Sequence, residues 1–257
     1  MPDESVAGIE PEPNASPRLP EPKFLNRSDR RCIESTTMKI VSLNIGLPRD
    51  VEWHGQSVTT GIFKSPTASR IRLRKLNLDG DRQADLTVHG GEHKAVYCYP
   101  AEHYVYWREK LPGRELPFGS FGENFTTEGL LENSVRIGDR FAIHDAEVVV
   151  SQPRLPCYKL GVRFQSDDMV KKFLASRRIG FYLAVTREGD VAAGDEMIPV
   201  VQNASKISIA DFLRLFLAKS FSAADRASLQ ELYALPSVPN DWKHYFHERV
   251  AEAGGAD

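Results

Sequence analysis

Short β-type runs broken by turn-forming residues constrain the fold of this chain more than any other feature of its sequence. From Met38 to about residue 203, hydrophobic and β-branched segments alternate with glycine, proline, asparagine and aspartate, a spacing typical of all-β sandwiches and barrels. Helices are expected only over 101–110 and 166–176, the second with Ser166 as its N-cap. Strands are expected over 38–45, 57–64, 70–76, 95–99, 140–151, 181–186 and 197–201. Strands and helices do not alternate regularly, so a doubly wound parallel sheet is not expected.

The pattern changes after Ser205 to helical segments that each follow a capping residue. Ser208 precedes Asp211 by three positions and Ser222 precedes Asp225 by three positions, which is the spacing of a capping box. The last segment begins at Asn240. These signals predict a small three-helix domain over 204–257, which follows a β-barrel over 38–203.

The amino-terminal segment, residues 1–37, differs from both of these parts. It contains six of the 16 prolines and few aliphatic side chains. A segment of this composition buries too little apolar surface to offset the entropy lost on ordering. We therefore expect a disordered extension over 1–37, and Met38 would be a natural start for the folded part.

Charge and cysteine content exclude several classes of protein. The net charge is −2, from 33 basic and 35 acidic residues that are well mixed, so no broad field would gather nucleic acid or an anionic membrane surface. No run approaches the roughly 18 apolar residues of a spanning helix, and the first 30 residues lack the order of a signal peptide. The three cysteines, which show no paired spacing, fit a reducing compartment. We expect a cytoplasmic protein without a membrane segment.

The densest cluster of unusual residues covers 79–96, between two expected strands. Gly90 and Gly91 would let the backbone approach a ligand closely. Arg82, His89 and Lys94 would then supply charge and hydrogen-bond donors to a phosphate or a polar heterocycle. The same residues could instead form a tight turn with solvated charges, since paired glycines are common in turns.

Two histidines in this cluster also raise the question of zinc. His89 and His93 stand four residues apart, which on a helix would place both on one face. The two intervening glycines make that helix unfavourable, and no further thiolates or imidazoles complete a zinc pattern. A zinc site is therefore not expected.

A second cluster lies at the end of the longest expected strand, over 150–160. Two prolines fix the backbone before Cys157, and Arg154 and Lys159 would favour its thiolate form. This setting suits a reactive or metal-binding cysteine, although a free cysteine can also be a small buried hydrophobe. Cys98, between tyrosines in a strand, is expected in the core, and Cys32 lies in the extension.

A third cluster over 118–126 mixes aromatic residues with glycines. Gly122, Glu123 and Asn124 could hydrogen-bond the edge of a pterin-like heterocycle. Alternatively, the segment is a glycine-bent loop anchored by Phe121 and Phe125. The residues of this segment do not decide between the two interpretations.

Taken together, the three clusters resemble MOSC domains of the YiiM type in their order and spacing. The final helices resemble the three-helix domain that follows the barrel in such proteins, so the resemblance runs from about Met38 to the carboxyl terminus. The segments that carry it are Gly80-Asp81, Ala84-Asp85, His89-Gly90-Gly91, Phe121-Gly122-Glu123-Asn124, Gly138-Asp139, Ser151-Gln152-Pro153-Arg154 and Pro156-Cys157-Tyr158-Lys159-Leu160.

The resemblance implies a mainly β fold, a MOSC β-barrel related to the barrel domain of pyruvate kinase, that binds a molybdenum cofactor (Mo-molybdopterin). It implies that Cys157 is the metal ligand. By residue type, Arg82, His89, Lys94 and Arg154 would bind the pterin phosphate, and Glu123 and Asn124 would be hydrogen-bonding wall residues. The expected cofactor-binding residues are Arg82, His89, Gly90, Gly91, Lys94, Gly122, Glu123, Asn124, Arg154 and Cys157. Either Glu123 or His89 would pass a proton during catalysis.

The activity implied by the resemblance is reduction of N-hydroxylated compounds, such as hydroxylaminopurine-type bases, as a detoxification. The chain shows neither a dinucleotide fingerprint nor an iron–sulfur cysteine set, so a separate electron-donating reductase is expected. We expect the final helices to dock onto the barrel, onto a second copy in a homodimer, or onto that donor.

Other functions remain open for the same residues. Cys157 could instead carry a persulfide as a sulfur carrier, since both uses need a thiolate, or the chain could be a non-catalytic module that binds a cofactor or partner. A DNA-reading helix-turn-helix is not expected, because residues 205–257 contain no excess of basic over acidic side chains. Pyridoxal phosphate is not expected either, because no lysine is set apart as a Schiff-base residue.

Overall fold

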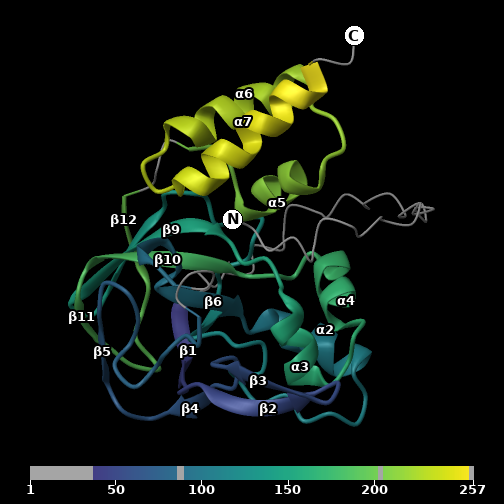
Figure 1. The fold of residues 1–257 in the computed structure, drawn as a ribbon. Coiled ribbons are helices and arrows are strands. Elements are labelled where there is room, and N and C mark those ends of the chain that lie inside the picture. The colour runs from purple at the N-terminus through teal and green to yellow at the C-terminus, as the bar shows by residue number, and fades with distance from the viewer. Residues whose placement is uncertain (1–36, 86–89, 202–204, 255–257) are drawn as a thin grey trace, which may run out of the picture.

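A curled sheet forms the body of the protein. The computed structural model describes residues 37–85, 90–201 and 205–254, and its largest sheet has the strand order β12-β8-β9-β10-β6-β7-β1-β4 (Figure 1). Neighbouring strands in it are antiparallel except β6 and β7, which are parallel. The strands are β1 (Lys39–Ile45), β4 (Ser65–Thr67), β6 (Val96–Pro100), β7 (Phe125–Glu128), β8 (Arg140–Ile143), β9 (Ala146–Pro153), β10 (Phe181–Arg187) and β12 (Ile198–Val201).

The curl brings the two ends of the sheet toward each other. The backbone N–H of Ile40 in β1 donates to Asp195 O at 3.0 Å, and that of Met197 donates to Met38 O at 2.8 Å. These bonds join β1 to the segment that precedes β12 at the other edge of the sheet. The predicted mainly β, barrel-type fold is therefore confirmed, in the form of a curled and partly closed sheet.

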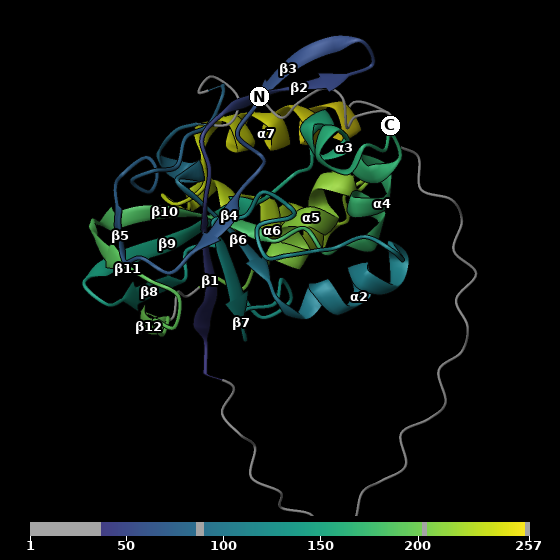
Figure 2. The same ribbon diagram turned by 90° about the horizontal axis from the view of Figure 1, so that it is seen from below.

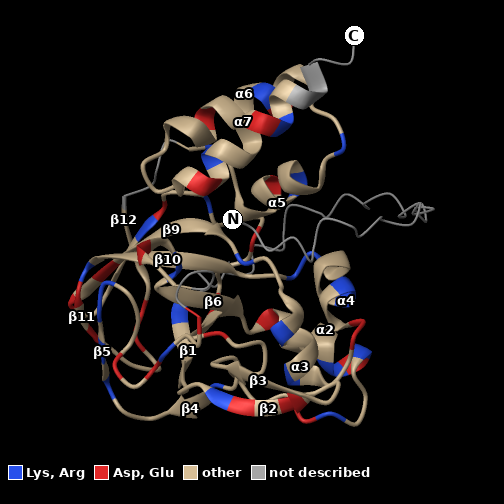
Figure 3. Ribbon diagram, in the orientation of Figure 1, with Lys and Arg blue, Asp and Glu red and all other residues tan. Residues whose placement is uncertain are grey.

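Two smaller ribbons extend from this sheet. A hairpin of β2 (Arg49–Trp53) and β3 (Gln56–Thr60) projects to one side (Figure 2). The second ribbon pairs β5 (Ile71–Leu73) with β11 (Gly189–Val191). Figure 3 shows both charge signs on β2 and few charged residues on the central strands β6, β9 and β10, as expected for strands that lie inside the structure.

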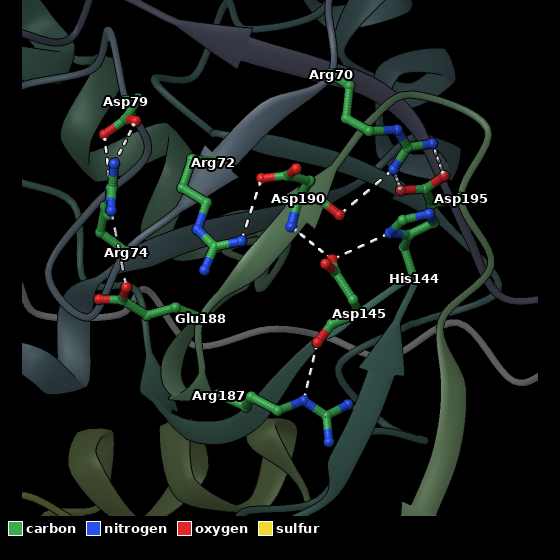
Figure 4. Close-up of polar contacts among 10 residues, drawn as sticks. All are labelled: Arg70, Arg72, Arg74, Asp79, His144, Asp145, Arg187, Glu188, Asp190 and Asp195. Carbon is green, nitrogen blue, oxygen red and sulfur yellow. Dashed lines mark hydrogen bonds and ion pairs between the residues drawn. The ribbon is translucent and has the colours of Figure 1, made fainter.

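A charged network holds the β5–β11 ribbon against the turn between β8 and β9 (Figure 4). Arg70 forms two 2.8 Å bonds with the Asp195 carboxylate. The Asp145 carboxylate accepts the backbone N–H of Asp190 at 2.6 Å, and its backbone carbonyl accepts Arg187 Nε at 2.8 Å. Most of these side chains are exposed, where individual ion pairs contribute little, so we interpret the network as a fastening of the ribbon.

Helices cover two sides of the sheet. The short 3₁₀ helix η2 (Glu92–Lys94) leads into β6, and the first group of α-helices comprises α2 (Glu102–Lys110), α3 (Tyr158–Phe164) and α4 (Met169–Ser176). The second group comprises α5 (Ile209–Leu217), α6 (Ala223–Ala234) and α7 (Asn240–Gly254), which lie above β9 and β10 in Figure 1. Within the described ranges, no helix is both long and apolar enough to cross a bilayer.

The carboxyl-terminal helices pack against the barrel rather than standing apart. Capping boxes at Ser208 and Ser222 begin α5 and α6, as the sequence predicts. Trp242 of α7 donates its indole N–H to the Gln152 side chain of β9, and the apolar side chains of both parts belong to one buried core. The division into domains at residue 203 stays a prediction, and the predicted disorder of 1–37 lies almost wholly outside the described residues.

Some predicted elements differ from the structure. The run 140–151 forms two strands, because His144 adopts a left-handed conformation (φ 52°) in the turn between β8 and β9. Ser166 is not the N-cap of α4, since that position belongs to Asp168. Five elements were not predicted from the sequence, because they are short or rich in polar residues and therefore give weak periodic signals: β2, β4, β7, β11 and α3.

Candidate functional site

Residues from the three sequence clusters meet at one open pocket of about 590 Å³, including the space at its mouth. Arg82, Lys94, Gly122, Asn124, Arg154 and Cys157, all predicted as cofactor-binding residues, line this pocket. The remaining lining residues are Thr60, Gly61, Ile62, Lys64, Gln83, Ala84, Tyr97, Lys159 and Tyr182. The pocket thus lies where the ends of several strands and the beginning of α3 meet.

Cys157 occupies the N-cap position of α3, directly after Pro156. Its backbone is extended (φ −118°, ψ 172°), and the residue is 5% exposed. It takes part in no disulfide. Cys98 lies in β6 with 0% exposure, and burial raises the pKa of its thiol well above the ordinary value. The prediction that Cys98 is a core residue is confirmed.

Arg154 presents a buried guanidinium to the pocket. The residue is 6% exposed, and its Nη1 atom has no hydrogen-bond partner in the structure. The guanidinium carbon lies 5.3 Å from the ring centre of Tyr97 and 5.8 Å from that of Phe173. Because a buried donor without a partner is costly, this nitrogen is suited to a ligand that brings an acceptor oxygen.

A second buried cation, Lys64, lies in the pocket wall. Its ammonium group pairs with the Asp81 carboxylate, and the two side chains are 7% and 1% exposed. Asp81 also accepts the backbone N–H of Gly46 and the side-chain amide of Asn124, each at 2.9 Å. Burial lowers the pKa of Lys64, although Asp81 opposes that effect. The ion pair joins the segment before β4 to the loop after β5, and the bond from Asn124 adds the loop before β7.

Asn124 is fixed on both sides of its amide. Its oxygen accepts the backbone N–H of Tyr97 at 3.2 Å, while its nitrogen donates to Asp81. Its backbone carbonyl accepts the N–H of Asn44 in β1 at 2.7 Å. Asn124 therefore joins β1 and β6 while it also lines the pocket.

Glu123 is fully buried and is not among the residues that line the pocket. Its buried carboxylate accepts the backbone N–H groups of Gly119 at 2.7 Å and Phe121 at 3.1 Å, and the hydroxyl groups of Tyr104 and Thr126. Burial raises the pKa of the Glu123 carboxyl, although several of these bonds lower it. In this position Glu123 holds the 119–122 turn.

The predicted glycines differ in their relation to the pocket. A Cβ on Gly122, which has φ 83°, would lie 2.8 Å from the Ile62 side chain, so only glycine fits the wall there. Gly90 and Gly91 precede η2 and are not among the lining residues. His89 lies outside the described residues, and its predicted roles stay predictions.

The pocket lining is strongly one-sided in charge. Five basic residues line it, and no aspartate or glutamate is among the described lining residues: Lys64, Arg82, Lys94, Arg154 and Lys159. The Arg82 side chain is exposed to solvent. Lys94 is half-buried, and this burial lowers its pKa. Such a lining attracts an anion.

Several lining residues with polar side chains were not predicted from the sequence, among them Lys64, Tyr97 and Tyr182. Lys64 stands in a short segment far from the motif clusters, and Tyr97 and Tyr182 lie in strands that read as ordinary core. Only the pairing of β10 with β6, which places Tyr182 opposite Tyr97, brings these two together. Within the described part of the chain, no group of three or more His, Cys, Asp or Glu side chains could hold a metal.

Comparison with known proteins supplies a family context for this pocket. The MOSC domain family matches residues 85–198. The uncharacterized protein YflK of Bacillus subtilis (strain 168) is 42% identical over 189 residues, which are 73% of this chain and 85% of YflK. The crystal structure of YiiM from Geobacillus stearothermophilus has a TM-score of 0.68 and 34% identity, and the match covers 83% of this chain and 99% of that one.

A more distant match carries a functional name. A protein named "Reductase" from Gibberella moniliformis (strain M3125 / FGSC 7600) is 30% identical over 171 residues. The match covers 65% of this chain and 30% of that protein.

Proposed function

Because this chain belongs to the MOSC domain proteins of the YiiM type, we propose that it is a molybdenum cofactor-dependent oxidoreductase. Its proposed substrates are N-hydroxylated compounds, including hydroxylaminopurine-type bases, and its proposed role is their detoxification in the cytoplasm. The similarity to a protein named as a reductase supports an oxidoreductase activity.

The observation that carries the proposal is that Cys157 and a buried guanidinium with one unsatisfied nitrogen, Arg154 Nη1, line the same pocket. Cys157 offers sulfur, a soft ligand that suits molybdenum. Arg154 offers a guanidinium whose Nη1 lacks an acceptor, and guanidinium groups bind phosphate well. A molybdenum cofactor has both a metal that accepts sulfur ligands and an anionic phosphate, so the residues fit this group.

Each lining residue would then have a defined task. Cys157 would ligate the metal, and Arg82, Lys94 and Arg154 would hold the phosphate end by charge. Gly122 and Asn124 would form the wall along the pterin. When bound, the cofactor supplies two-electron chemistry that the protein side chains lack.

The reaction must balance protons as well as electrons. Reduction of an N-hydroxyl group breaks the N–O bond, consumes two electrons and two protons, and releases one water and the amine. We propose His89 as the group that passes a proton to the departing oxygen, and Glu123 as the residue that fixes the adjacent loop. A separate reductase would supply the electrons.

Metal analysis beside activity tests this proposal. The wild type, Cys157→Ser and Cys98→Ser would be produced in a host that makes the cofactor, and molybdenum would be measured per chain. We expect near-stoichiometric molybdenum and reduction of an N-hydroxylated base, with chemically reduced viologen as electron donor, in the wild type. Cys157→Ser should lose both while its circular dichroism stays unchanged, because Cys157 is the N-cap of α3 and serine is favoured at that position.

Cys98→Ser is the matched control, since it removes a thiol that does not line the pocket. It should lower the unfolding temperature and retain molybdenum. Full molybdenum occupancy and activity in Cys157→Ser would refute the proposed ligation. A wild type that never holds molybdenum but accepts sulfur on Cys157 would instead identify the chain as a persulfide carrier.

A further inference from the structure

The amino-terminal turn of α7 reaches the barrel close to the cofactor pocket. Trp242 Nε1 donates to Gln152 Oε1 at 2.6 Å, and Gln152 Nε2 donates to the backbone carbonyl of His93 at 3.2 Å. Ser151 Oγ donates to the same carbonyl at 2.6 Å. Trp242 and Gln152 are 6% and 3% exposed, so water does not compete freely for these bonds.

Two members of this hydrogen-bond chain, His93 and Gln152, stand close in sequence to pocket residues. His93 belongs to η2, and the next residue, Lys94, lines the pocket. Gln152 stands two positions before Arg154, which also lines it. The indole N–H of Trp242 therefore orients the Gln152 amide. Gln152 belongs to the end of β9 and donates to the His93 carbonyl, so its side chain links β9 to η2.

Electrostatics place α7 beside the same cation. The Asp241 carboxylate raises the pKa of Lys94, against the larger effect of burial, which lowers it. Burial lowers the pKa of His93, and Lys243, in the same turn of α7, lowers it further. Asp241 and Lys243, in the first turn of α7, are therefore near enough to η2 to act on its two basic side chains.

We propose that Trp242 is a positioning residue for the pocket, and that through Gln152 it holds Lys94 and Arg154 in the arrangement that binds an anion. This inference rests on the proposed anion-binding role of the pocket. The carboxyl-terminal helices would then support the binding site from outside, since none of their described residues is among those that line it.

The experiment compares Trp242→Phe with a control in the same helix. Phenylalanine keeps an aromatic ring against Phe212 and Phe246, whose ring centres lie 4.9 and 5.7 Å from that of Trp242. It removes the N–H donor together with part of the buried indole volume, and the control variant accounts for the lost packing. Phe246→Leu weakens the same aromatic cluster without touching Gln152. Binding of inorganic pyrophosphate would be measured by calorimetry at low salt, beside hydrogen exchange of the Lys94 amide, which bonds to Gly91 O.

We expect Trp242→Phe to weaken pyrophosphate binding roughly threefold to tenfold, the worth of one neutral hydrogen bond, and to speed exchange of the Lys94 amide. Phe246→Leu should lower thermal stability and change neither quantity. Gln152→Met approaches the same contact from the barrel side. Its effect should not add to that of Trp242→Phe in the double variant, because both remove the same bond.

The outcomes separate this inference from the proposed function. Unchanged pyrophosphate affinity in both Trp242→Phe and Gln152→Met, with a wild type that binds, would overturn the positioning role and leave the proposed activity standing. A wild type that does not bind pyrophosphate would overturn the anion-binding role on which both depend. A third outcome is that both variants bind pyrophosphate more weakly than the wild type and that the wild type never takes up molybdenum. This result would support the positioning role and reject the reductase.

Discussion

Replacing Asp81 with asparagine should reveal how strongly the pocket wall depends on one buried ion pair. Asp81 accepts three hydrogen bonds, from Gly46 N, Asn124 Nδ2 and the ammonium of Lys64. Asparagine has the same shape but only one acceptor oxygen. Its amide nitrogen must face either the ammonium or the Asn124 amide, and Lys64 keeps a buried charge without a counterion.

The expected cost follows from that unpaired charge. Removal of one partner from a buried ion pair costs about 3–5 kcal/mol of folding free energy, so Asp81→Asn should lower the free energy of unfolding in urea by about that amount. Burial lowers the pKa of Lys64 in the folded protein, so the folded chain releases this proton more readily than the unfolded chain does. The destabilisation should therefore be largest near neutral pH and shrink as pH rises toward the ordinary lysine value of 10.5.

Two controls make the test decisive. Asp79→Asn, two positions away, affects a carboxylate that is 51% exposed and paired with exposed Arg74, and should change stability little. Adding Lys64→Met to Asp81→Asn removes the stranded charge and should recover about 2 kcal/mol or more. A loss below about 1 kcal/mol in Asp81→Asn, or no recovery in the double variant, would refute the reasoning.

Two further predictions concern the backbone and the charged network. Gly180→Ala should lower the free energy of unfolding in urea by more than about 2 kcal/mol, because φ is 68° and a Cβ would lie 2.2 Å from Cys98 O. Gly194→Ala should lower it less, because φ is 94° but a Cβ would meet nothing within 4 Å. Equal losses in the two variants would contradict the steric reasoning. The Asp145 carboxyl has a pKa of about 2 because His144 bonds to it, so its contribution to stability is lost as pH falls from 3.8 through 2. In His144→Ala, titration followed by NMR should show the pKa of Asp145 moving up toward 3.8, and an unchanged pKa would count against this pairing.

The fold class could be predicted because turn signals and β-type runs repeat through residues 38–203. The capping boxes of α5 and α6 were predictable for the same reason: they depend on two residues three positions apart. Strands such as β2, with the sequence RDVEW and little burial, could not be predicted. β2 has no buried face to give an apolar pattern, and it forms because it pairs with β3 in a hairpin.

The candidate pocket could be predicted in part. Cys157 and Arg154 stand close together in sequence beside rigid prolines, so the chain itself displays their setting. Lys64 comes from the segment before β4 and Tyr182 from β10, far apart in sequence, and only the curl of the sheet brings them to the same place. Glu123 has the residue type of a proton donor, but its carboxylate accepts hydrogen bonds from the backbone of its own loop. No sequence pattern predicts those bonds.

The position of β1 within the sheet also has a consequence for biosynthesis. Asn44 of β1 bonds to Asn124, which is 80 residues further along the chain, and β1 pairs with β4 on its other side. At a translation rate of about 5–20 residues per second, the ribosome needs roughly 4–16 s to make the chain between these contacts. During that interval β7, the strand that pairs with β1, has not been made. Ile40 and Leu43, which are fully buried in the finished protein, then lie in a strand whose partner is missing. The nascent chain therefore passes through a period in which a molecular chaperone has an apolar strand to bind.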